Sequence, residues 1–302
     1  MTNELELMQE IQEPEQWDEQ KLSRLLDRLR NGEETLSFSS IKSFIPPYGS
    51  PRQFIAYKMR EKKQTPAMLL GDLIDCILLS PDEFETRFVS VPDGCAKNSF
   101  AGLEAWVLFL NRLNIPVDIT GAKMADARFV VDLGIEQLNQ SGKTIVDSSV
   151  LKSAKAIAGA VMKNDTGYWF LNEIGATQVP VEYEAFGWKW RGKKDAEGQD
   201  FIIDMKLTVA ANEKDFGYQI RKMGYLYQAA IYTQGGKSKK EFYFMGYDRS
   251  GEVIVLHVGR AHIEKAWEQL EGFISQFDRM IFEDKFLWSQ DFWRKNGIFE
   301  YL

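Results

Sequence analysis

The first half of the sequence repeats apolar residues at helical spacing. Leu22, Leu25, Leu26 and Leu29 fall on one face of a helix over residues 21–30. Residues 65–79 are apolar apart from a few positions, and they predict a buried helix. Further helices are predicted over residues 105–113, 122–140 and 148–163.

The pattern changes after residue 176. The segment TQVPVEYEAFGWKWRGKKDAEGQDFIIDMKLT is rich in β-branched and aromatic residues and has turn residues at 186–187 and 196–198. It predicts three strands in a meander. A helix over 215–233, a hairpin that turns at 248–251 and a helix over 261–282 follow. This order predicts an α/β or α+β fold, with a central mixed β-sheet flanked by helices.

The N-terminal segment differs from the rest in charge. The first twenty residues hold seven acids and no Lys or Arg, so they account for the whole net charge of −7. We interpret residues 1–35 as an acidic tail with a short helix, and residues 36–302 as one domain that carries the function. The tail is either mobile or a helix that pairs with a partner.

Composition excludes several classes of protein. No apolar run approaches eighteen residues, so no transmembrane helix is expected. The acidic start does not resemble a secretory signal. Cys76 and Cys95 make neither a disulfide framework nor a zinc site, which favours a reducing cytoplasm. With only His257 and His262, chemistry built on several histidines is excluded.

Two short basic clusters interrupt the near-neutral remainder of the chain. They are Lys189, Arg191, Lys193 and Lys194 in KWRGKK, and Lys237, Lys239 and Lys240 in GGKSKK. Local cations of this kind are what a phosphate backbone requires. A solvated surface is the alternative explanation for both clusters.

The stretch FIIDMKLT carries the main chemical signal. Asp204 and Lys206 are two positions apart on a predicted strand, so they share a face. Asp195 precedes the tight reversal at 196–199, and a hairpin would bring it beside Asp204. Two converging carboxylates favour a divalent cation, and oxygen ligands favour Mg²⁺ or Mn²⁺. Lys206 would then orient or deprotonate a water, or stabilise developing charge. The alternative is a solvated strand end with a charge pair.

The helix that follows adds to this signal. In GYLYQAAIY, Tyr225, Gln228 and Tyr232 are spaced by three and four residues and so share one helical face. A glutamine between two tyrosines is unusual for a face that only packs. A half-buried aromatic stripe is the alternative, above all for Tyr225.

Four segments together resemble a known family. They are LSFSSIKSFIPPYGSP, TPAMLLGDLIDCILLSPDEFETRF, GWKWRGKKDAEGQDFIIDMKLT and YQAAIY. In this order they resemble the Ser-rich helix start, the G-x-x-x-H-x-x-L-L-x-P-x-x-F helix, the D … D-x-K-T core and the Q-x-x-x-Y helix of the PD-(D/E)XK nucleases. The resemblance spans Leu36 to Tyr232 and is greatest to phage- and prophage-type exonucleases similar to RecE (exonuclease VIII) and to the RecB nuclease domain. It implies a restriction-endonuclease-like core.

The resemblance also implies roles for particular residues. Asp195 and Asp204 would be metal ligands, with the Met205 carbonyl completing the shell, and Lys206 would be the catalytic lysine. Gln228 and Tyr232 would support the site or contact the strand end. An acidic position on the first strand of the meander corresponds to Glu182 or Glu184, of which we prefer Glu182. Lys189, Arg191, Lys193, Lys194 and Tyr225 are the candidate nucleic-acid contacts.

One residue departs from the family pattern. Asp75 stands in the helix where the family usually has a metal-binding histidine. Aspartate is a competent Mg²⁺ ligand, so we expect Asp75 to join the metal site. The alternative is a helix residue that faces polar surroundings.

The function implied is an Mg²⁺-dependent exonuclease, with Mn²⁺ as a second possible ion, that hydrolyses linear double-stranded DNA in phage-type recombination or end processing. Digestion from 5′ to 3′, a ring-like homo-oligomer and a single-strand annealing protein as partner follow by analogy alone. Two alternatives stay open. One is a non-catalytic nucleic-acid-binding protein that keeps the fold, and the other is an endonuclease of the same superfamily.

Overall fold

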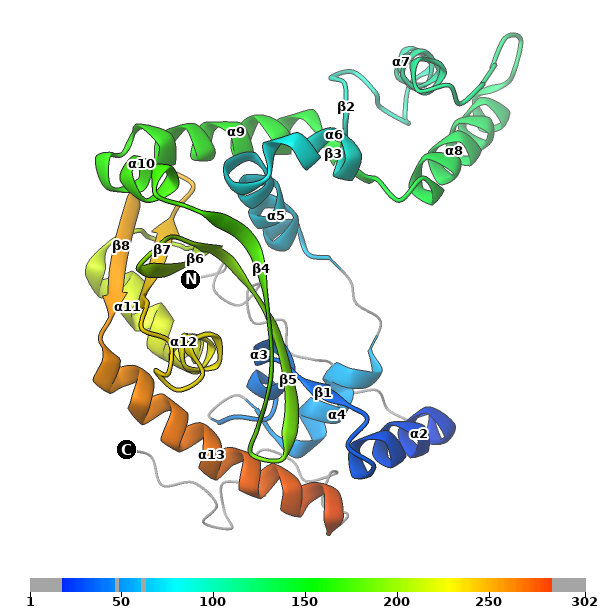
Figure 1. Cartoon of the computed structure of the whole chain (residues 1–302). Coiled ribbons are helices and arrows are strands. Elements are labelled where there is room, and N and C mark those ends of the chain that lie inside the picture. The colour runs from blue at the N-terminus through cyan, green and yellow to red at the C-terminus, as the bar shows by residue number, and fades with distance from the viewer. Residues whose placement is uncertain (1–17, 47–48, 61–63, 284–302) are drawn as a thin grey trace. The chain divides into compact units, whose positions relative to one another are not determined.

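The computed structural model describes residues 18–46, 49–60 and 64–283. It divides the chain into two compact units (Figure 1). Unit 1 comprises Met1–Thr65 and Lys163–Leu302, and unit 2 comprises Pro66–Met162. Among the described residues, no helix has the length and apolar character needed to span a bilayer.

Unit 1 is built on a mixed six-stranded sheet. Its strands are β1 (Thr35–Leu36), β4 (Ala176–Ala185), β5 (Trp188–Glu197), β6 (Phe201–Leu207), β7 (Glu241–Tyr247) and β8 (Val253–Val258). The order is β1-β5-β6-β7-β8, with β4 on β5. The β1–β5 and β6–β7 pairs are parallel, and the others are antiparallel. The predicted fold class, a mixed sheet flanked by helices, is confirmed.

The turns predicted at 186–187 and 248–251 are present, whereas the turn predicted at 196–198 is displaced, because β5 continues to Glu197 and β6 begins at Phe201. Phe186 and Gly187 both have positive φ, at 54° and 77°, as a tight two-residue hairpin between twisted strands requires. The second turn is held by Asp248, whose carboxylate accepts hydrogen bonds from the backbone amides of Ser250 and Glu252. Figure 1 shows the resulting β4–β5 hairpin as a long curved ribbon.

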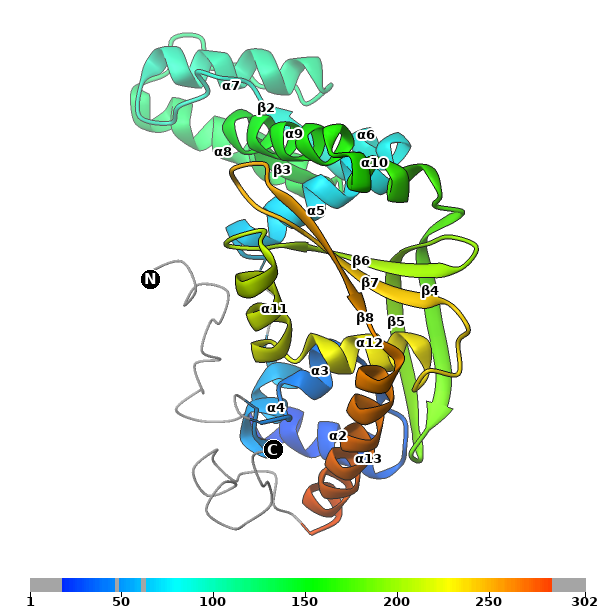
Figure 2. The same ribbon diagram turned by 90° about the vertical axis from the view of Figure 1, so that its left-hand side faces the viewer.

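The helices of unit 1 are α2 (Glu19–Arg30), α3 (Phe38–Lys42), α4 (Pro51–Met59), α10 (Asp165–Asn172), α11 (Glu213–Lys222), α12 (Tyr225–Thr233) and α13 (Arg260–Phe282). Three of them, α3, α11 and α13, pack against one buried helix, α12. All side chains from residue 228 to 233 of α12 are buried. Helix α12 lies between β5 and α13 (Figures 1 and 2). Leu25, Leu26 and Leu29 of α2 belong to the same core, so α2 shares it with residues beyond 35.

The single helix predicted over 215–233 is wrong. Two helices, α11 and α12, meet at Gly224, which has φ of +66°. This left-handed conformation costs a glycine little and ends the helical hydrogen-bond ladder. The apolar periodicity continues across the break, which is why the pattern alone indicated one helix.

Unit 2 has a hydrophobic core of its own. Its elements are α5 (Pro66–Leu79), the short 3₁₀-helix η1 (Pro81–Glu83), α6 (Phe84–Arg87), β2 (Phe88–Val91), α7 (Phe100–Arg112), α8 (Met124–Gln140), β3 (Thr144–Asp147) and most of α9 (Ser148–Lys163). Leu103, Trp106 and Leu110 of α7 pack with Val131 and Leu138 of α8. The helices predicted at 122–140 and 148–163 are confirmed, whereas the parallel β2–β3 pair was not predicted.

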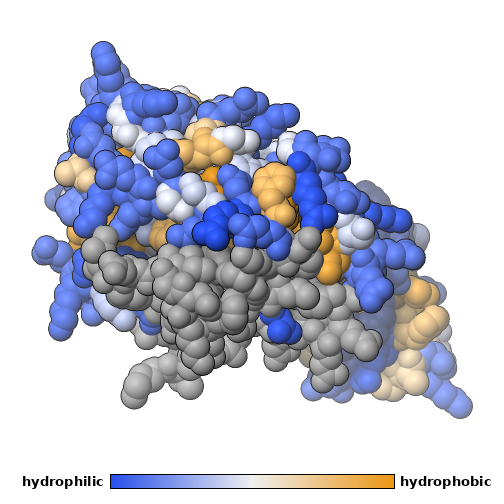
Figure 3. All heavy atoms as spheres, turned by 90° about the horizontal axis from the view of Figure 1, so that it is seen from below, coloured by the Kyte–Doolittle hydropathy of each residue, from blue (hydrophilic) through white to orange (hydrophobic). Residues whose placement is uncertain are grey.

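The surface of the described part is mainly polar on the side that Figure 3 shows. Hydrophilic residues predominate there, and apolar residues appear in small separate areas. Such scattered apolar residues are normal for a globular surface and need no partner to explain them.

Helix α11 packs on the sheet at a glycine. A Cβ on Gly246 of β7 would lie 2.7 Å from the Cε1 atom of the buried Phe216 ring. We expect Gly246→Ala to lower the free energy of unfolding by about 1–3 kcal/mol, since the ring must move. Gly217→Ala in α11, where a Cβ would meet only Arg221 Nη1 at 3.7 Å, should be neutral or stabilising by up to about 1 kcal/mol. Urea denaturation measures both, and equal effects would contradict the packing argument.

Candidate functional site

The predicted acidic residues lie where two strands separate. Strand β6 pairs with β7 from Phe201 to Leu207, but with β5 only at Ala196↔Ile203 and Glu197↔Ile202. Continuing that register places Asp195 opposite Asp204, where β5 leaves β6. The hairpin argument from the sequence therefore gave the correct neighbours.

Asp195 hydrogen-bonds to the edge of β6 at the point where β5 no longer pairs with it. Its Oδ2 atom accepts a hydrogen bond of 2.7 Å from the Met205 backbone amide. Burial raises the pKa of the Asp195 carboxyl, while the Lys206 ammonium and the Met205 amide oppose that rise. The same hydrogen bond fixes Met205, whose carbonyl remains a predicted metal ligand.

Asp204 is a buried carboxylate, 1% exposed. Its Oδ2 atom forms an ion pair with the Lys206 ammonium, and its Oδ1 atom accepts a hydrogen bond of 2.8 Å from Gln228 Nε2. Burial raises the pKa of Asp204 to about 7; Lys206 lowers that pKa and Asp195 raises it. Burial alone would lower the pKa of Lys206, but the carboxylates of Asp204 and Asp195 raise it above the usual range. Lys206 is therefore held in its charged form.

Helix α12 orients this cluster. Gln228 Nε2 also donates to the Tyr232 hydroxyl over 3.1 Å, so the two side chains share a face as the spacing predicted. The Tyr232 ring packs on β5 at Gly192, where a Cβ would lie 2.7 Å from Cε1. The contact of Tyr232 with Gly192 thus fixes the distance between α12 and β5. At this distance Gln228 reaches Asp204.

Tyr225, predicted as a nucleic-acid contact, lies against the cluster. The Nζ atom of Lys206 is 5.1 Å from the centre of its ring, and that of Lys42, from α3, is 5.3 Å away. Burial raises the pKa of the Tyr225 hydroxyl, so the phenol stays neutral. Sequence reasoning missed Lys42, because α3 and α12 are distant in the chain.

The donor set fits a hard divalent cation. Two carboxylates converge, and the buried Oε1 atom of Gln228 has no hydrogen-bond partner in the described part of the chain. Within residues 18–46, 49–60 and 64–283, no three His, Cys, Asp or Glu residues gather around a common point. Mg²⁺ commonly uses one or two carboxylates and keeps several waters, so two carboxylates are sufficient for a partial shell.

Asp75, the expected additional ligand, belongs to unit 2. It is half-buried on α5, between the buried Ile74 and Cys76. The cluster of Asp195 and Asp204 belongs to unit 1. Participation of Asp75 in the metal site stays a prediction.

Glu182 is not brought into the cluster. It is exposed on β4, opposite Arg191, and Glu184 is opposite Lys189. Arg191 is four positions from Asp195 on β5, or about 13 Å along a strand. A direct catalytic role for Glu182 therefore gains no support from the described contacts.

The first basic cluster is partly balanced by acids. Lys189, Arg191 and Lys193 are exposed on one face of β5. Across from the first two lie Glu184 and Glu182, so only Lys193, opposite Pro180, has an uncharged residue facing it. Lys194 forms an ion pair of 2.8 Å with Glu197. DNA binding by these four residues stays a prediction.

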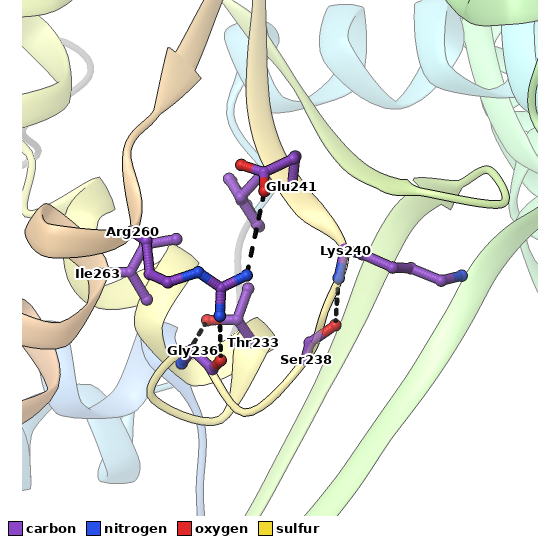
Figure 4. A pocket seen from close by; sticks show the side chains of 8 residues that line it. Thr233, Gly236, Ser238, Lys240, Glu241, Arg260 and Ile263 are labelled. Carbon is purple, nitrogen blue, oxygen red and sulfur yellow. Dashed lines mark hydrogen bonds and ion pairs between the residues drawn. The ribbon is translucent and has the colours of Figure 1, made fainter.

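Lys240 of the second basic cluster is one of the residues that line a small hollow beside β7 (Figure 4). Arg260 points into it and donates a hydrogen bond of 2.9 Å to the Gly236 carbonyl. The Lys240 side chain points away and donates over 2.8 Å to the Gly198 carbonyl. These internal bonds account for the polar groups of the hollow, which supports the interpretation as ordinary surface.

A strained residue lies across from Asp195. Gln178 of β4 has φ of +53°, and it lies between the β4–β5 pairs Thr177↔Ala196 and Val179↔Lys194 without pairing itself. Regular alternation from Gly192, which faces Tyr232, would turn Asp195 away from α12. The positive φ of Gln178 therefore marks an irregular point of β4 directly opposite Asp195. The sequence gives no signal for it.

Comparisons with known proteins agree with the fold. Residues 37–285 match the family described as "PDDEXK-like domain of unknown function (DUF3799)". A search of curated proteins finds no match. The crystal structure of a "Putative exonuclease" from Eubacterium rectale is similar in fold, with a TM-score of 0.52, 17% identity and 83% of each chain covered.

The hydrogen bond from Gln228 makes a pH-dependent contribution. Between about pH 4 and 7 the folded state keeps a proton on Asp204 that the unfolded state has lost, so the wild type loses stability as the pH rises there. Gln228→Met removes a donor that binds the charged form of Asp204 more strongly than the neutral form. We expect it to cost about 1–3 kcal/mol at pH 8.5 and clearly less at pH 5. Urea denaturation in EDTA measures this.

Tyr232→Phe is the matched control for that experiment. It removes the hydroxyl that accepts from Gln228 and leaves Asp204 with its donor. Its effect should therefore depend little on pH. A penalty for Gln228→Met that is the same at both pH values would contradict the role assigned to this hydrogen bond.

Proposed function

The chain belongs to the PDDEXK-like domain family, and from this premise we propose that it is a divalent-metal-dependent exonuclease acting on linear double-stranded DNA. Membership places it in the PD-(D/E)XK nuclease superfamily. The observation that carries the proposal is the convergence of Asp195, Asp204 and Lys206 at the separation of β5 and β6, with Gln228 bonded to Asp204.

The acidic and basic residues of the site have different proposed roles. Asp195 and Asp204 would hold the cation, and the hydrogen bond from the Met205 amide to Asp195 ties β5 to β6. A bound Mg²⁺ or Mn²⁺ would polarise the scissile phosphate and lower the pKa of the attacking water. Lys206, held charged, donates to a phosphate oxygen or to the water and stabilises negative charge in the transition state. Gln228 keeps Asp204 oriented while this happens.

The broader assignments rest on resemblance. They are 5′ to 3′ polarity, a homo-oligomer, an annealing protein as partner and a role in phage-type recombination or end processing. An inactive nucleic-acid-binding protein is the second candidate, and the replacement of the family histidine by Asp75 favours it. The complete Asp195, Asp204 and Lys206 set supports catalysis instead.

The first test is hydrolysis of DNA. With Mg²⁺, the wild type should degrade linear duplex DNA and leave closed circular DNA intact. Asp204→Asn and Lys206→Met should each lower the rate at least about a hundredfold, because each removes a charge from the reacting centre. Gel analysis of both substrates measures this. Cleavage of circular DNA would identify an endonuclease. Absence of any cleavage would contradict the nuclease proposal and favour the non-catalytic nucleic-acid-binding protein.

The second test concerns Asp75. If it is a ligand, Asp75→Asn should raise the Mg²⁺ concentration for half-maximal activity about tenfold or more. Asp72→Asn, on the same helix, is the matched control and should leave the Mg²⁺ dependence unchanged. Thermal unfolding with and without Mg²⁺ gives a second readout, since a bound ion stabilises the folded state. Identical behaviour of the two variants would remove Asp75 from the metal site.

A further inference from the structure

Lys42 is a second lysine at the candidate active centre. It is the last residue of α3 and is partly buried. Its Nζ atom is 5.8 Å from the centre of the Phe38 ring and 5.3 Å from that of Tyr225. The Lys206 ammonium contacts the same Tyr225 ring at 5.1 Å. Two ammonium groups thus meet on one aromatic side chain.

Lys58, Lys206 and Lys240 are partly buried as well, and each has a carboxylate partner that Lys42 lacks among the described residues. Lys58 lies 5.9 Å from the centre of the Phe54 ring, but it also forms an ion pair of 2.7 Å with Glu34. Lys206 pairs with Asp204, and Lys240 with Glu197. In the part of the chain that the structure describes, no carboxylate lies within ion-pair distance of Lys42.

This arrangement leaves a cation without its counterion. Burial and the neighbouring Lys206 lower the pKa of Lys42 to about 8. An anion beside Lys42 would relieve both effects, and contacts with aromatic faces alone compensate a desolvated charge only in part. Ser37 and Ser40 of the same segment do not bind the Lys42 ammonium, because they hydrogen-bond to each other as a capping box.

We propose that Lys42 binds a backbone phosphate of the DNA strand, next to the phosphate that Lys206 serves. This inference rests on the proposed function. Lys42 is then a positioning residue: it holds the strand in register over the site, and the Tyr225 ring keeps the two ammonium groups apart. A phosphate contact carries no base preference, so Lys42 should act equally on all sequences.

The test compares Lys42→Ala, Lys42→Arg and the matched control Lys58→Ala on one duplex. Fluorescence anisotropy in Ca²⁺, from about 50 to about 200 mM KCl, gives Kd and its salt dependence. Lys42→Ala should bind roughly tenfold more weakly, and its slope of log Kd against log salt should fall by about 0.9, the value for one lost phosphate contact. Lys42→Arg should keep the wild-type slope, as should Lys58→Ala.

Cleavage kinetics with Mg²⁺ complete the test. Lys42→Ala should lower kcat/KM mainly by raising KM, and Lys42→Arg should recover most of the loss. If the wild type cleaves DNA and Lys42→Ala keeps its salt slope and KM, the proposal for Lys42 is overturned while the proposed function stands. If the wild type neither binds nor cleaves DNA, the proposed function itself fails. Should Lys42→Ala not fold, Lys42→Gln against Lys42→Arg gives the same comparison of charge at similar length.

Discussion

The charge on the buried Asp204 is the constraint around which unit 1 is arranged. A carboxylate that is 1% exposed would be neutral at ordinary pH without help. Lys206 supplies the opposite charge and Gln228 a hydrogen bond, whereas Asp195 on the next strand adds repulsion. The protein groups alone compensate the negative charge of these two neighbouring carboxylates only in part. A bound cation would supply the missing positive charge.

Small residues let the supporting helices approach the sheet. Gly192 admits the Tyr232 ring, and Gly246, in register with Lys206, admits the Phe216 ring. Gly224 allows α11 and α12 to change direction between these two contacts. Ring-on-glycine packing on two different strands therefore supports the position of Gln228 over Asp204, together with its hydrogen bonds.

The sequence predicted those features that depend on local pattern. Strand alternation placed Asp204 with Lys206, the short reversal placed Asp195 beside Asp204, and helical spacing placed Gln228 with Tyr232. The break at Gly224 was missed, since periodicity does not register a single left-handed residue. Alternation with the buried Val181 indicates that Glu182 is exposed, whereas the resemblance to the family implied a role in the site. Lys42 and the strain at Gln178 depend on tertiary contacts and so had no local signal.

The pairing of β1 with β5 has a consequence for how the protein reaches this state. Thr35 and Leu36 pair with Lys189 and Trp190, so the whole of unit 2 lies in the chain between the two partners. Closing such a long loop costs conformational entropy before the stabilising contacts form, and this slows folding. During synthesis, the first strand and α3 must wait for the meander and α12 to emerge. Unit 2, with its separate core, has the contacts to fold during that interval, and the centre assembles last.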